Sequence, residues 1–117
     1  MPAKQLEASV RRLPGVAIID LRGEINATAE AALNAAYAEA EQGDPRAVLL
    51  NFVEVDYINS TGIALIVGLL ARARSSNRQL RAYGLSDHYV EIFHITRLAD
   101  FMQVFSDEAA AVAVGES

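Results

Sequence analysis

The chain has 117 residues, of which 52% are hydrophobic and 21% charged, so it has the composition of a folded protein and the length of one domain, residues 1–117. It has no cysteine, which excludes disulfides, a thiolate nucleophile and cysteine-bound zinc. Its net charge of −5 disfavours binding to the phosphate backbone of nucleic acid, so we expect no direct contact with DNA or RNA.

The first half of the chain predicts two strands, a helix and a third strand. Residues 7–12 form a weak strand candidate, and the turn signal at 13–15 joins it to a β-branched, apolar strand over 16–22. An alanine-rich run predicts a helix from about Thr28 to Gln42, which Gly43-Asp44-Pro45 ends. The continuous apolar run over 47–52 is typical of a buried parallel strand.

The second half continues the alternation of helices and strands. The predicted elements are a helix over 60–75, a strand over 80–84, a helix capped by Ser86 and Asp87 that ends near Arg97, an edge strand over 101–105 and a last helix opened by residues 106–108. This order predicts an α/β fold with a largely parallel sheet, to which the first hairpin adds an antiparallel strand. We therefore expect a small mixed sheet.

No catalytic or metal site is predicted. His88 and His94 are six residues apart, so on one helix they would point in different directions, and no cysteine or close carboxylate pair completes a metal site. The chain has neither a G-x-S-x-G nucleophile motif nor a glycine-rich phosphate loop. We expect a protein that is not an enzyme and has no metal or cofactor.

The chain gives no sign of export or membrane insertion. Residues 1–12 lack the apolar core of a signal peptide, and the longest apolar run, residues 63–71, is about half the length of a spanning helix. We expect a cytoplasmic protein with no membrane partner.

The turn N-S-T-G, residues 59–62, places small polar groups at the start of a helix. As N-cap, Ser60 would accept a hydrogen bond from the N–H of Gly62 or Ile63. A helix N-terminus also favours an anion, so a phosphate on Ser60 would be tolerated. Gly62 has no side chain, so the surface of another molecule could approach the turn closely. The turn follows the carboxyl end of a central strand, where α/β sheets carry their sites. Capping and chemical use of Ser60 both remain open.

Four segments of the chain resemble a known family. They are GEINAT (23–28), AVLLNFVEVDYINSTGIALIVGLLARAR (47–74), LRAYGLS (80–86) and ITRLADFMQVFSDEAAAV (95–112). In this order they resemble the STAS domain of anti-sigma-factor antagonists. The resemblance implies a small mixed sheet with helices packed mainly on one face, and a partner-switching function.

The resemblance also implies partners and a site. In this family the domain binds an anti-sigma factor that is also a serine kinase. The kinase phosphorylates a serine at the start of the second helix, which ends binding, and a phosphatase restores it. By motif that serine is Ser60, and the implied partner-binding residues around it are Asn26, Asn59, Thr61 and Gly62.

Three positions depart from the family pattern. Asn26, Asn51 and Asn59 stand where the family commonly has aspartate. Each change keeps the shape of the side chain and removes a charge, which weakens the acidic surroundings of the serine. The alternative is a STAS module that is not phosphorylated, such as a stress-signalling scaffold or a transporter accessory subunit.

Overall fold

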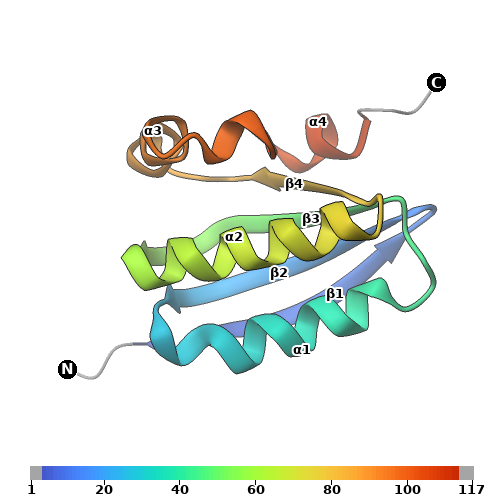
Figure 1. The fold of residues 1–117 in the computed structure, drawn as a ribbon, viewed down its shortest axis with the longest axis horizontal. Helices are drawn as coiled ribbons and strands as arrows, with labels where there is room; N and C mark the ends of the chain where they lie inside the picture. Colours follow the sequence, from blue (N-terminus) through green and yellow to red (C-terminus); the bar gives the residue numbers. More distant parts are fainter. Residues whose placement is uncertain (1–3, 114–117) are drawn as a thin grey trace.

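The computed structural model describes residues 4–113, which fold into one five-stranded sheet and its helices (Figure 1). The elements are β1 (Glu7–Leu13), β2 (Val16–Ile25), the 3-10 turn η1 (Ala27–Ala29), α1 (Glu30–Glu41), β3 (Ala47–Ile58), α2 (Ser60–Ser75), β4 (Gln79–Tyr83), α3 (Asp87–Ile95), the 3-10 turn η2 (Leu98–Asp100), β5 (Gln103–Phe105) and α4 (Glu108–Ala113). The strand order is β1-β2-β3-β4-β5; β1 is antiparallel to β2 and the other neighbours are parallel. The predicted α/β class and mixed, largely parallel sheet are confirmed.

The two central strands are longer than predicted. β2 continues to Ile25 instead of ending at residue 22, and β3 continues to Ile58 instead of ending at residue 52. The sequence pattern is misleading here because the pairing of β2 with β3 is irregular after Asp20 and again after Gly23, which breaks the alternation of buried and exposed residues. The pairing nevertheless ends in register, with Ile25 opposite Ile58.

The helices lie mainly on one face of the sheet, as the family resemblance implied. Figure 1 shows α1 and α2 along the same face of β1–β3. Their buried side chains share one core with those of β2 and β3, and Phe93 of α3 joins this core edge-to-face against Phe52, with ring centroids 6.0 Å apart. α4 covers part of the opposite face, where Ala111 packs in a smaller cluster with Val16, Ile18 and neighbouring strand residues.

The remaining elements agree closely with expectation. The helix predicted over 60–75 has those bounds, and Ser86 caps α3, accepting a hydrogen bond from Tyr89 N at 3.4 Å. β5 is shorter than the predicted 101–105 because Phe101 ends η2. Across residues 4–113, no helix combines the length and the apolar character that a membrane crossing requires.

Candidate functional site

The turns that open η1 and α2 lie side by side at one end of the sheet. Asn26 follows Ile25 and Asn59 follows Ile58, and these two isoleucines are register partners in the parallel pair β2–β3. The N–H of Asn59 donates to the carbonyl of Ile25 at 3.2 Å, which ties the two turns together. The site therefore stands at the carboxyl end of the central strands, as predicted for an α/β sheet.

Asn59, and not Ser60, is the N-cap of α2. Its backbone is extended, with φ −94° and ψ −177°, and its Oδ1 accepts from the N–H of Gly62 at 2.8 Å. The predicted cap at Ser60 is wrong because the helix begins one residue earlier than a serine cap would allow, with Ser60 as its first residue. The amide of Asn59 performs the capping that was one of the two expected uses of the Ser60 hydroxyl.

This shift leaves the Ser60 hydroxyl without a structural task. Ser60 is exposed, and its hydroxyl has no hydrogen-bond partner among residues 4–113. Thr61 is exposed beside it, while Asn59 and Asn26 are half-buried. A side-chain hydroxyl that the fold does not use is free to be modified without loss of a cap.

Gly62 is buried beneath the turn. A Cβ at this position would lie 2.1 Å from the carbonyl oxygen of Ile25 and 3.0 Å from Cγ2 of Ile58. Only a glycine therefore allows α2 to start so close to the end of β2. The space beside Gly62, which we expected another surface to use, is filled by the protein's own backbone. A partner could reach Gly62 only through its exposed neighbours.

Asn26 plays the same part in the neighbouring turn. Its Oδ1 accepts from the backbone N–H of Thr28 at 2.9 Å and from the Thr28 hydroxyl at 2.6 Å. Both asparagines at this end thus act as hydrogen-bond acceptors, a task that an aspartate could perform equally well.

Asn51 lies outside this site. It is on the face of the sheet opposite to α1 and α2. There its Nδ2 donates to Asp20 Oδ1 at 2.8 Å and its Oδ1 accepts from Val53 N at 3.0 Å. Of the three asparagines for which the resemblance implies an aspartate, two therefore lie at the Ser60 end of the sheet and one does not. The donor in the first bond must be an amide, because a carboxylate has no hydrogen to donate.

Asp20 belongs to a polar network that holds α4 on the sheet. Arg11 of β1 binds Asp20 through two nitrogens and Glu108, the first residue of α4, at 2.7 Å. The Tyr83 hydroxyl also donates to Glu108, at 2.6 Å. Hydrogen bonding to Arg11 lowers the pKa of both carboxyl groups, while burial and the bond to Glu108 raise the pKa of Tyr83. We call Arg11, Asp20, Asn51, Tyr83 and Glu108 the back-face network.

Sequence reasoning missed this network because its members are far apart in the chain. Arg11 and Glu108 are separated by 97 positions. The one local signal was the placement of Asp20 and Asn51 within otherwise apolar strands, where a polar side chain needs a partner.

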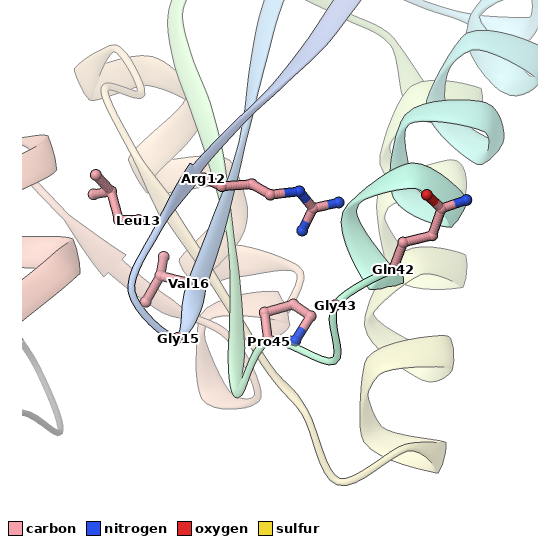
Figure 2. A pocket seen from close by; sticks show the side chains of 7 residues that line it. All are labelled: Arg12, Leu13, Gly15, Val16, Gln42, Gly43 and Pro45. Atoms are coloured by element: carbon pink, nitrogen blue, oxygen red, sulfur yellow. The ribbon is translucent and has the colours of Figure 1, made fainter.

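The end of the molecule far from Ser60 has a hollow between the β1–β2 turn and the segment that joins α1 to β3 (Figure 2). Arg12 reaches across it and donates to the carbonyls of Glu39 and Ala40, so its charge stabilises the C-terminus of α1. No group of three or more histidines or acids within residues 4–113 could hold a metal ion, and His88 and His94 are exposed. Neither the hollow beside Arg12 nor the two histidines therefore offers an alternative to the site around Ser60.

The comparison with known proteins agrees with this fold. A family model, the STAS domain, matches residues 7–111. The anti-sigma-B factor antagonist of Staphylococcus aureus is 30% identical over 86 residues, 74% of this chain and 80% of that protein. A crystal structure of an anti-sigma factor antagonist from Mycobacterium paratuberculosis is similar with a TM-score of 0.83 and 16% identity, covering 97% of this chain and 96% of that one. The Bacillus cell fate determinant SpoIIAA in its phosphorylated form is similar with a TM-score of 0.69 and 20% identity, over 92% and 98%.

Proposed function

Since this chain belongs to the STAS-domain family, we propose that it acts as an anti-sigma-factor antagonist: it binds an anti-sigma factor that is also a serine kinase, and phosphorylation of Ser60 switches the binding off. The observation that carries the proposal is the exposed Ser60 hydroxyl, which has no hydrogen-bond partner among residues 4–113 and opens α2 beside the Asn59 cap. Such a protein works by occupying its partner and catalyses nothing itself.

A phosphate at Ser60 would change the surface and spare the fold. It adds about −1.5 to −2 charge at neutral pH. The first turn of α2 has no acidic residue, and the helix N-terminus favours an anion, so the charge is accepted locally. The same charge within a partner interface would lose its hydration and meet any acids opposite, which weakens binding.

The proposed contact surface consists of the residues that surround Ser60. Asn26, Asn59 and Thr61 would contact the partner through their side chains, and Gly62 would act through the position it gives to α2. The kinase would bind the ATP that phosphorylates Ser60, and a cognate phosphatase would restore binding. This function would place the protein in the cytoplasm, with no direct contact to nucleic acid or membrane.

Calorimetry with the anti-sigma factor kinases encoded in the same genome tests the proposal. We expect one of them to bind the wild type, and Ser60→Asp to lower the affinity by about tenfold or more, which corresponds to about 1.4 kcal/mol. Ser60→Ala should bind like the wild type but resist the switch. Ser106→Asp, which adds the same charge at an exposed position before α4, is the matched control and should bind normally.

Mass spectrometry of the chain after incubation with the bound kinase and ATP completes the test. The proposal requires phosphate on Ser60 of the wild type and none on Ser60→Ala. Equal affinity of Ser60→Asp and wild type would contradict the switch. If the wild type binds its partner but the kinase adds no phosphate to it, the alternative is a non-phosphorylated scaffold or transporter module, which the uncharged Asn26 and Asn59 favour.

A further inference from the structure

The outer side of α2 contains a glycine that the fold does not require. Gly68 is exposed in the middle of the helix, and within residues 4–113 a Cβ there would meet no atom within 4 Å beyond the neighbouring backbone of its own helix. A glycine in a helix interior weakens the helix relative to alanine. Unlike Gly62, which the packing of α2 demands, Gly68 therefore lowers stability with no compensating contact among the residues that the structure describes. A close approach by another molecule would explain it.

Next to Gly68 is an apolar groove between α2 and the end of η2. It is lined by Val67, Leu70, Ala71, Arg74 and Phe101, which we call the α2 groove. Val67 is 46% exposed and Phe101 59% exposed, so both present large apolar surfaces to solvent. The guanidinium carbon of Arg74 lies 5.3 Å from the centre of the Phe101 ring, which places a positive charge at the groove's edge.

The charge of α2 differs from that of the rest of the chain. The chain carries a net charge of −5, yet the sixteen residues of α2 include no acid, and their charged residues are Arg72 and Arg74 in the last turn. A solvated helix face normally carries charged side chains, as α1 does with its glutamates. The outer side of α2 is instead small, apolar and positive at one end.

We propose that the α2 groove and Gly68 bind a helix of the anti-sigma factor, a helix with an apolar face and a carboxylate placed against Arg74. This rests on the proposed function and adds a second contact to it. Apolar side chains would fill the groove, and Gly68 would let the two helix backbones approach closely. Arg74 supplies the charge complementarity that selects an acidic helix.

The second contact is distant from the switch. Arg74 is fourteen positions after Ser60, which corresponds to about 21 Å along the helix. A phosphate on Ser60 would therefore leave the α2 groove intact. The switch therefore acts on the contact around Ser60 and not on the α2 groove.

The test is a binding series with the kinase that binds the wild type. Gly68→Gln places a side chain in the proposed contact and improves the helix, so we expect its melting temperature to rise and its affinity to fall at least about tenfold. Ala35→Gln, the same new side chain at an exposed position of α1, is the matched control and should stay within about twofold of wild type. Arg74→Glu should weaken binding, and the loss should shrink at high salt.

The outcomes separate this inference from the proposed function. Normal affinity of Gly68→Gln together with weak binding of Ser60→Asp would overturn the groove and keep the switch. Weak binding of Gly68→Gln together with normal binding of Ser60→Asp would keep the groove and overturn the switch. A wild type that binds none of the kinases overturns both.

Discussion

Asn59 and Asn51 are both asparagines where the family resemblance implies an aspartate, and the structure uses them in opposite ways. Asn59 accepts: its Oδ1 caps α2 by receiving the N–H of Gly62 at 2.8 Å. Asn51 donates: its Nδ2 gives a hydrogen bond to the carboxylate of Asp20 at 2.8 Å. An aspartate could replace the first amide and could not replace the second.

The difference shows that asparagine in place of aspartate has different consequences at the two positions. At Asn59 the fold does not require the missing charge, so we expect its effect on the proposed phosphorylation of Ser60. At Asn51 an aspartate would place a second carboxylate against that of Asp20. The amide avoids this repulsion and so helps to hold α4 on the sheet. The four predictions below test this comparison, beginning with the largest expected effect.

Gly62→Ala tests the geometry of the Ser60 end most severely. Its Cβ would overlap the carbonyl of Ile25, so the start of α2 must move, and we expect a loss of about 3 kcal/mol or more in the free energy of unfolding. Gly68→Ala is the matched control in the same helix, where open space allows a gain of up to about 1 kcal/mol. Urea denaturation should show a lower free energy of unfolding for Gly62→Ala and a higher one for Gly68→Ala. Equal changes would contradict the close packing of the start of α2 against β2.

Asn51→Asp tests the donor. It removes the hydrogen bond to Asp20 and sets two carboxylates together in a half-buried place, so we expect a loss of about 1–2 kcal/mol at neutral pH. Asn34→Asp, an exposed position in α1, controls for the added charge and should change stability little. An unchanged denaturation midpoint for Asn51→Asp would mean that the back-face network contributes nothing.

Acidification tests the same network through its carboxylates. Asp20 and Glu108 have pKa values below their ordinary 3.8 and 4.5, because both bind Arg11. Their stabilisation is therefore complete above those ordinary values and is lost as the pH falls through the lowered folded-state pKa values. The loss should be modest, because both groups are partly exposed. Arg11→Gln should flatten the acid side of the stability profile; an identical profile for both proteins would contradict the attachment.

Asn59→Asp has the smallest expected effect on stability. The carboxylate still caps α2 and its charge suits the helix N-terminus, so we expect a change of no more than about 0.3–1 kcal/mol, in the stabilising direction. Asn59→Ala, which removes the cap, should cost about 1 kcal/mol. The rate of phosphorylation on Ser60 should change more than stability for Asn59→Asp, because the new charge is next to the reacting hydroxyl. Equal rates in a kinase time course would show that the acid is not needed.

Some features of this protein were readable from its sequence because they depend on near neighbours. Ser60–Ser75 was predicted with its observed bounds, since a polar turn, an apolar run and terminal arginines are local signals of a helix. The cap by Ser86 and the alternation that predicts an α/β fold are local in the same sense. The position of Ser60 at the carboxyl end of a central strand followed from that order.

Other features were decided by contacts between distant segments. Local propensity allows both Asn59 and Ser60 as caps, and the bond from Asn59 N to Ile25, in another strand, selects the first. The need for glycine at position 62 arises from Ile25, and the role of Asn51 arises from Asp20. By itself the sequence determined which segments form helices and strands and where Ser60 stands among them. Only the tertiary structure decided which polar groups are used internally and which remain free, because a hydrogen bond is satisfied by whatever group the fold brings within reach.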